Sequence, residues 1–163
     1  MFKIVPMLTI DGVIAGNYRT GFSGLDINRM FGHNAKKRLN PEAFLLKDLA
    51  KAEKKVSFFF DIHGHSNRKS IFVYGPRYPL HSEHYASIRI LPKLVQERSK
   101  MFRYFSCRFA NEKSKQNCSR LCFNRELHLP QSYTLEASMF AWLDRETRQT
   151  HQLDALSLIN FGK

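Results

Sequence analysis

The pattern of apolar and polar positions predicts an α/β protein whose most apolar stretch is a strand near residue 60. Residues 56–63 contain Phe58-Phe59-Phe60, and consecutive large apolar residues are typical of a strand covered on both faces. The strand runs into His63-Gly64-His65, a glycine turn with two histidines. Ligands of α/β folds bind at the carboxyl ends of strands, so this turn is the first candidate for chemistry.

Before this strand, the pattern predicts a first strand, a long loop and a helix. Residues 2–8 form an apolar run typical of a strand, and residues 9–12 are expected to turn the chain. The glycine-punctuated residues 16–29 are too long and irregular for a simple connection, which indicates a functional loop. Asn40-Pro41-Glu42 is a helix start, with the helix running to about residue 55. This order predicts a crossover unit with parallel strands.

After this strand, further elements follow without a repeat or a dividing linker. A strand is expected at residues 70–75. A helix is expected at residues 81–100, kinked or split by Pro92. Three more elements complete the expectation: strands at 118–128 and 131–138, joined through Pro130, and a short amphipathic helix at 150–161. The chain is therefore expected to form one domain over residues 1–163.

The net charge, the length of the apolar runs and the cysteines indicate the class of protein and its partners. The chain carries 26 Lys and Arg against 14 Asp and Glu, a net charge of +12. This charge implies an acidic partner: nucleic acid, an anionic membrane or an acidic polypeptide. No apolar run approaches the ~20 residues of a membrane helix, and no signal peptide precedes the first motif, so a soluble intracellular protein is expected. The three cysteines are interpreted as reduced, structural thiols.

Four ordered motifs carry a resemblance to a known family. They are Phe2-Lys3-Ile4-Val5-Pro6-Met7-Leu8 with Asp11-Gly12-Val13-Ile14 and Gly16-Asn17-Tyr18-Arg19; Gly24-Leu25-Asp26-Ile27-Asn28-Arg29; Asp61-Ile62-His63-Gly64-His65-Ser66; and Ser132-Tyr133-Thr134-Leu135-Glu136-Ala137-Ser138. In this order they resemble the cytosolic carboxypeptidase subfamily of the zinc carboxypeptidases. Two departures are Thr9-Ile10, where the family has Asn-Pro, and Met30, where it has asparagine.

The resemblance implies a fold, an activity and a place in the cell. The fold would be a three-layer α/β/α sandwich with a mixed, largely parallel sheet, and residues 1–163 would be the N-terminally truncated catalytic domain. The family's proteins are cytosolic metallocarboxypeptidases that remove C-terminal amino acids. Several shorten glutamate tails on tubulin and other acidic proteins. The expected partners are therefore acidic C-terminal tails such as those of glutamylated tubulin, in the cytoplasm.

The resemblance also implies site residues. His63 matches the third protein ligand of a catalytic Zn²⁺, and Glu136 matches the carboxylate that activates the zinc-bound water. Arg19 matches the arginine that stabilises the oxyanion, which needs positive charge where negative charge develops. Asn28 and Arg29 match the pair that binds the terminal carboxylate. The planar guanidinium of arginine can donate two parallel hydrogen bonds to a carboxylate.

Three other side chains are weaker candidates for the site. Strand alternation places Asp61 on the same face as His63, where it could orient the ligand or serve as a salt-bridged structural acid. His65 is expected to line the site while pointing away from the metal. Arg120 lies in a segment that precedes the catalytic glutamate's strand in the family, and it could line a pocket for an acidic side chain.

The sequence lacks two of the three zinc ligands that the family uses. A catalytic zinc of this class needs two histidines and a glutamate, and two of these come from a His-x-x-Glu motif upstream of the first strand. These 163 residues contain no His-x-x-Glu. The sequence thus predicts the base, the substrate clamp and one zinc ligand, and zinc binding by His63 alone is not expected.

Three hypotheses remain open. The first is the catalytic half of a cytosolic carboxypeptidase. The second is an inactive relative that binds acidic tails through Arg19, Arg29 and the basic surface. The third is a basic nucleic-acid-binding protein, which ranks last because no aromatic-basic RNA signature or recognition-helix pattern is present.

Overall fold

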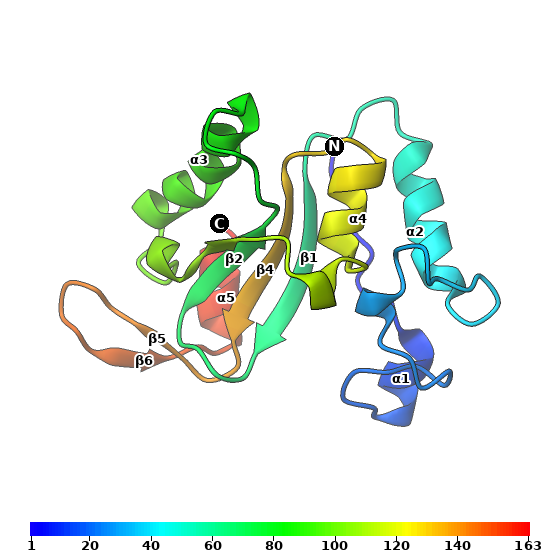
Figure 1. Ribbon diagram of the computed structural model, residues 1–163. Coiled ribbons are helices and arrows are strands. Elements are labelled where there is room, and N and C mark those ends of the chain that lie inside the picture. The colour runs from blue at the N-terminus through cyan, green and yellow to red at the C-terminus, as the bar shows by residue number, and fades with distance from the viewer. The chain divides into compact units, whose positions relative to one another are not determined.

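Two structural units are each assembled from two separate stretches of the chain. A computed structural model describes all 163 residues (Figure 1). The helical unit comprises Met1–Ser57 with Glu112–Leu129, and the sheet unit comprises Phe58–Asn111 with Pro130–Lys163. Each unit therefore depends on contacts between residues that lie far apart in the sequence.

A four-stranded sheet forms the centre of the sheet unit, in the order β1-β4-β2-β3. Its strands are β1 (Phe59–His65), β2 (Ile71–Gly75), β3 (Arg108–Phe109) and β4 (Ser132–Ser138). The pairs β1–β4 and β2–β3 are parallel, and β2–β4 is antiparallel. Figure 1 shows β4 running between β1 and β2. The predicted α/β class with a mixed, largely parallel sheet is confirmed.

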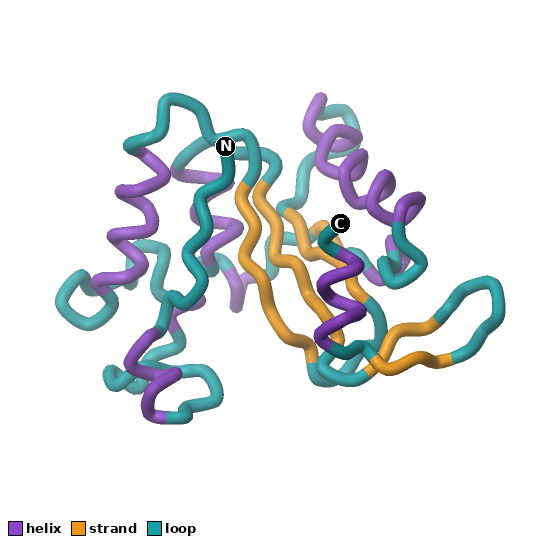
Figure 2. Tube along the Cα trace, turned by 180° about the vertical axis from the view of Figure 1, so that it is seen from behind, coloured by secondary structure: helices purple, strands orange, loops and turns teal.

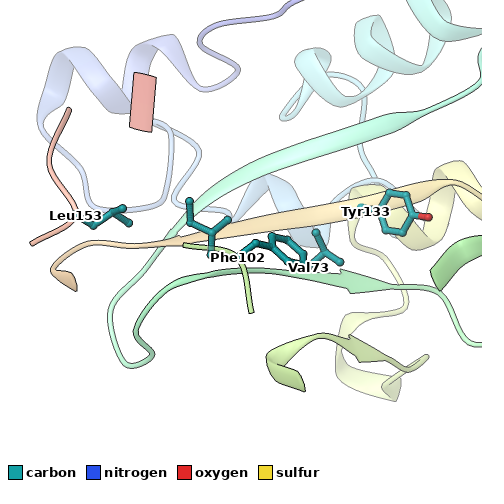
Figure 3. Close-up of a cluster of buried hydrophobic side chains, with 5 residues drawn as sticks. Val73, Phe102, Tyr133 and Leu153 are labelled. Atoms are coloured by element: carbon teal, nitrogen blue, oxygen red, sulfur yellow. The ribbon is translucent and has the colours of Figure 1, made fainter. Parts of the chain in front are cut away.

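Two helices of the sheet unit pack over the same face of this sheet, α3 (Glu83–Arg98) and α5 (Ala155–Phe161). A half-open cavity of about 240 Å³ lies between the sheet and these helices, and every residue that lines it is apolar or aromatic. In Figure 2, α5 crosses in front of the strands. The buried cluster beside it consists of Ile71, Val73, Phe102, Tyr133 and Leu153 (Figure 3).

Helix α3 continues through Pro92 although proline has no backbone N–H to donate. The carbonyl that would accept from position 92 belongs to Ile88, four residues earlier. The hydroxyl of Tyr133 donates a 2.8 Å hydrogen bond to this carbonyl oxygen. The sequence predicted that Pro92 would kink or split the helix; the structure shows one helix whose orphaned carbonyl is bound by the sheet.

The helical unit has a small aromatic core and several short helices. They are α1 (Ile10–Ala15), the 3₁₀ turn η1 (Ile27–Arg29), α2 (Pro41–Lys51), the 3₁₀ turn η3 (Lys113–Lys115) and α4 (Ser119–Glu126). Phe31 and Phe123 meet edge to face with ring centroids 6.2 Å apart. Lys47 donates to the Phe31 carbonyl at 2.6 Å and to Glu126 at 2.7 Å. These contacts tie α2 and α4 to the segment after η1.

The predicted first strand is wrong. Residues 2–8 belong to no strand, and residues 1–7 are exposed. A strand obtains its backbone hydrogen bonds from neighbours, and no strand of the structure pairs with this segment. Residues 9–12 were expected to turn, yet Ile10 begins helix α1. The predicted crossover unit of two parallel strands is therefore absent, although its helix exists as α2 and ends four residues earlier than expected.

Two predictions near the C-terminus also need correction. Residues 118–128 were expected to be a strand but contain helix α4, in which apolar Leu121, Cys122 and Phe123 are buried. The expected helix at 150–161 begins only at Ala155, because Asp154 caps it by accepting a 2.8 Å hydrogen bond from the Ser157 N–H. The remaining elements were not foreseen: β3, η2 (Tyr104–Ser106), and the hairpin of β5 (Ala141–Leu143) and β6 (Thr150–Gln152).

Candidate active site

His63 and Glu136 lie side by side on neighbouring parallel strands. In the register of β1 with β4, His63 pairs with Glu136 and Asp61 pairs with Thr134. Successive residues of a strand point to opposite faces, so these four side chains share one face of the sheet. Phe60 pairs with Tyr133 one position before the Asp61–Thr134 pair, so both rings point to the opposite face. They stack on each other there, on the face that α3 and α5 cover. The sheet thus places a candidate ligand and a candidate base together, on the face away from the apolar cavity.

Asp61 contacts the imidazole of His63 directly. The Oδ1 atom of Asp61 lies 2.9 Å from Nε2 of His63. A carboxylate in this position selects the tautomer of the ring and holds its orientation. Strand alternation predicted the shared face, and the structure adds a direct contact between the two side chains. Glu136 is buried, with 8% of its surface exposed.

His65 is the last residue of β1, so the His63-Gly64-His65 segment that was predicted to turn belongs to the strand. Its Nδ1 accepts hydrogen bonds from the backbone N–H groups of Asn67 and Arg68, both at 3.1 Å. Its ring meets Phe72 edge-on, with centroids 5.2 Å apart. Since one ring nitrogen is occupied by the backbone, His65 is placed as a structural residue at the end of β1 rather than as a metal ligand.

The residues present do not complete a zinc site. Catalytic zinc takes three protein ligands. The described residues, which are the whole chain, contain no group of three or more His, Cys, Asp or Glu side chains that could hold a metal ion. One imidazole and one carboxylate in register supply fewer donors than the three protein ligands of a catalytic zinc.

The carboxylate of Asp11 fixes the loop that carries Arg19 through hydrogen bonds to the backbone. One oxygen of the Asp11 carboxylate accepts from the Gly12 N–H at 2.8 Å, and the other accepts from the Phe22 N–H at 2.6 Å. A Cβ at Gly21 would lie 2.8 Å from both oxygens of this carboxylate, so any larger residue would have to displace the Asp11 side chain. The loop predicted to be functional therefore has a defined conformation, although it contains no sheet or long helix.

Asp26 connects Arg19, predicted to stabilise the oxyanion, with Asn28 and Arg29, predicted to bind the terminal carboxylate. Its Oδ1 accepts from the Asn28 N–H at 3.0 Å, which caps η1. Its Oδ2 accepts from Nε of Arg19 at 2.6 Å and lies 3.9 Å from Nη1 of Arg29. Sequence reasoning assigned no role to Asp26. Its signal was its place two residues before Asn28, because aspartate often binds the backbone N–H two residues on.

Asn28 links this cluster to α4. Its side-chain oxygen accepts a 2.8 Å hydrogen bond from the N–H of Ser119, the first residue of α4. Arg120 follows in the same helix and is 5% exposed. The helical unit therefore contains Arg19 and the three predicted substrate-binding residues Asn28, Arg29 and Arg120, whereas the sheet unit contains His63 and Glu136.

The fold is that of the metallo-carboxypeptidases. A metallo-carboxypeptidase from Burkholderia cenocepacia matches 97% of this chain with a TM-score of 0.77 at 20% identity, over 40% of its own chain. A metallo-carboxypeptidase from Pseudomonas aeruginosa, in complex with (2-guanidinoethylmercapto)succinic acid, matches 97% with a TM-score of 0.76 at 19% identity, over 42% of its own chain.

Sequence similarity identifies the nearer relatives. Cytosolic carboxypeptidase 1 of Gallus gallus is 35% identical over 155 residues, covering 85% of this chain. Cytosolic carboxypeptidase 2 of Danio rerio is 31% identical and cytosolic carboxypeptidase 4 of Homo sapiens is 32% identical, each over 99% of this chain. The chain is thus a relative of the cytosolic carboxypeptidases, as the motifs indicated. It spans 13%, 23% and 17% of the lengths of these three proteins. A scan against protein-family models finds no match.

Proposed function

We propose that this protein is a zinc-dependent metallocarboxypeptidase and that residues 1–163 form part of its catalytic domain. The observation that carries the proposal is the parallel register that pairs His63 with Glu136, with Asp61 holding the imidazole. His63 would supply one zinc ligand. Two further protein ligands would have to come from outside these 163 residues, because no third donor accompanies His63 here.

The other residues have roles that their chemistry supports. Glu136 would take a proton from the attacking water and pass it to the leaving amine, as a general base and then a general acid. Arg19 would donate to the oxygen on which negative charge develops. Asn28 and Arg29 would bind the terminal carboxylate of the peptide, which is what distinguishes an exopeptidase substrate.

The substrates would be acidic C-terminal tails, such as those of glutamylated tubulin, in the cytoplasm. The net charge of +12 supports an acidic partner. Arg120, next to the residue that holds Asn28, would receive an acidic side chain. The names of the relatives support a cytosolic location, and no helix of the structure combines the length and apolarity that a membrane span requires.

Zinc content and hydrolysis test this proposal. Plasma mass spectrometry of the purified 163-residue protein should find well below one zinc per chain. The full natural chain should release glutamate from a peptide ending in three glutamates and none from the C-terminally amidated peptide. Glu136→Gln should lower the rate by about 10²–10⁴-fold, whereas Glu83→Gln, an exposed acid at the start of α3, should leave it unchanged. Full activity of Glu136→Gln would disprove the assignment of the base.

A second candidate function is binding of acidic tails through Arg19, Arg29 and the basic surface without hydrolysis, which the net charge of +12 supports. In that case the full natural chain binds the free-acid peptide, holds no zinc and releases no glutamate. A nucleic-acid-binding function predicts a different result. Association with nucleic acid would then weaken steeply with salt, and glutamate peptides would not bind.

A further inference from the structure

We propose that Asp26 is a positioning residue that holds Arg19 for the oxygen on which negative charge develops and Arg29 for the terminal carboxylate of the peptide. The proposal rests on the proposed function, since it concerns the same substrate-binding residues. It adds a residue to which sequence reasoning gave no role. It also predicts which nitrogen atoms contact the substrate.

One carboxylate organises the whole cluster. Its two oxygens reach Nε of Arg19, Nη1 of Arg29 and the backbone N–H of Asn28. The contact with Arg19 is the strongest of these, a charge-assisted hydrogen bond of 2.6 Å. It closes the loop between residues 19 and 26, which passes through Gly24 in the left-handed conformation at φ +70°. Asp26 therefore joins the loop to the 3₁₀ turn.

The nitrogen that Arg19 uses to bind Asp26 determines which of its N–H donors can still bind the substrate. A guanidinium has five N–H donors, one on Nε and four on the two terminal nitrogens. Asp26 uses Nε, and the terminal nitrogens of Arg19 make no hydrogen bond in the structure. Arg29 differs, because one of its terminal nitrogens, Nη1, donates to the Asn28 carbonyl at 2.9 Å. An oxygen of the substrate can thus bind the terminal nitrogens of Arg19 without displacing Asp26.

The charges of the three side chains support a positioning role for Asp26. Two guanidinium groups and one carboxylate leave a net charge of +1, which favours an anionic substrate. Without Asp26, two like charges would have to be held close together, and each long side chain would regain its rotamer freedom. Asp26 reduces the repulsion and restricts both side chains before the substrate arrives, which is preorganisation of a binding site.

Nitrogen-15 NMR of arginine side chains tests the contact directly. The Nε–Hε signal of Arg19, assigned by its loss in Arg19→Lys, should exchange slowly with water in the free protein. It should broaden in Asp26→Asn, whose amide keeps an acceptor for the Asn28 N–H but has no charge. When the free-acid triglutamate peptide is added, the signal should persist. Its loss on peptide binding would show that the substrate displaces Asp26, and this would overturn the proposal.

Peptide affinity provides the second measurement. Asp26→Asn should weaken binding of the free-acid peptide about fivefold, the upper range for an exposed ion pair, and leave the amidated peptide unchanged. Asp26→Glu should recover part of the loss. The control is Asp48→Asn on α2, which makes the same change in charge but contacts neither arginine. Tighter binding of both peptides to Asp26→Asn than to Asp48→Asn would mean that Asp26 only neutralises charge, which contradicts positioning.

The two proposals can fail separately. If the wild-type protein does not distinguish the free acid from the amide, the carboxypeptidase assignment of the clamp is wrong. The Arg19 signal then still decides on Asp26, because it is measured without peptide. A fast-exchanging Arg19 signal that is the same in the wild type and in Asp26→Asn would reject the positioning role, whatever the protein binds.

Discussion

The two units hold their candidate site residues in different ways. In the sheet unit, His63 and Glu136 are placed by the backbone ladder of β1 and β4, whose register fixes which side chains meet. In the helical unit, Arg19, Asn28 and Arg29 are placed by side-chain contacts to Asp26. A ladder tolerates changes in side chains, whereas a cluster built on one carboxylate depends on that residue. We therefore expect the candidate residues of the two units to respond to different mutations.

The largest effect should come from the core of the sheet unit. Tyr133 is fully buried on β4, one of the buried cluster residues (Figure 3), three residues before Glu136. Tyr133→Ala should lower the free energy of unfolding by about 3–5 kcal/mol, through lost apolar contacts and a larger cavity. Denaturant titration followed by hydrogen exchange checks this. Protection should fall throughout β1 and β4, and equal protection of these strands would show that the ladder does not depend on the cluster.

The second effect is a fall in the free energy of unfolding at alkaline pH, caused by one thiol in each unit. Burial raises the pKa of Cys107 in the sheet unit and of Cys122 in the helical unit from 9.0 to about 11. Between pH 9 and 11 the unfolded chain loses these protons while the folded protein keeps them. The unfolded state is therefore favoured, and stability falls as pH rises by up to about 1.4 kcal/mol per pH unit for each thiol.

Single substitutions separate the two thiols. Cys107→Ala and Cys122→Ala should each remove about half of the fall in stability between pH 9 and 10, measured by denaturant titration at closely spaced pH values. Above pH 10, Tyr133 also contributes, because burial raises its pKa as well. An unchanged slope in either variant would mean that the corresponding thiol ionises in the folded protein as readily as in the unfolded chain.

The third effect should be confined to the helical unit. A Cβ at Gly12 would lie 2.5 Å from the Thr20 carbonyl oxygen, a backbone atom next to Arg19. Gly12→Ala should therefore destabilise this unit by about 1–3 kcal/mol, the usual range for overpacking. The Arg19 Nε–Hε signal should shift, while amide signals of β1 and β4 should not.

Gly16→Ala is the matched control for this change. Gly16 has φ +74°, and nothing lies within 4 Å of its Cβ position. The substitution should cost about 1–2 kcal/mol from backbone strain and leave the Arg19 signal in place. If both alanine variants shifted the Arg19 signal equally, the close approach of Gly12 to Thr20 would not be what fixes the loop.

The sequence pattern predicted the arrangement of site residues in the sheet unit but not in the helical unit. The shared face of Asp61 and His63 came from the two-residue period of strands, and the structure adds their contact. The clamp residues came from the resemblance to the carboxypeptidases, and nothing in the sequence pattern gave their arrangement. Asp26 was missed because hydrogen bonds of loop side chains have no periodicity.

The wrong elements also have physical reasons. Residues 2–8 have the composition of a strand, but strand formation depends on a partner that sequence pattern cannot supply. In residues 118–128 the short apolar run around Cys122 fits a strand or a helix, and periodicity does not separate the two for runs this short. The spacing of Cys118 and Cys122, which equals about one helical turn, was the signal that favoured α4.

The smallest effect is the coupling energy between Tyr133 and Pro92, which comes from the hydrogen bond to the Ile88 carbonyl. Tyr133→Phe should cost about 1–3 kcal/mol, because it leaves the buried Ile88 carbonyl without its donor. In a Pro92→Ala background, residue 92 has an N–H that can donate to the same carbonyl, so the hydroxyl becomes dispensable. The cost of Tyr133→Phe should then fall by about 1 kcal/mol in a double-mutant cycle measured by denaturant titration. Additive costs would mean that the helix, rather than the sheet, already satisfies this carbonyl. The coupling would show that even in the unit organised by a backbone ladder, one side-chain hydrogen bond joins the strand that carries Glu136 to the helix that covers it.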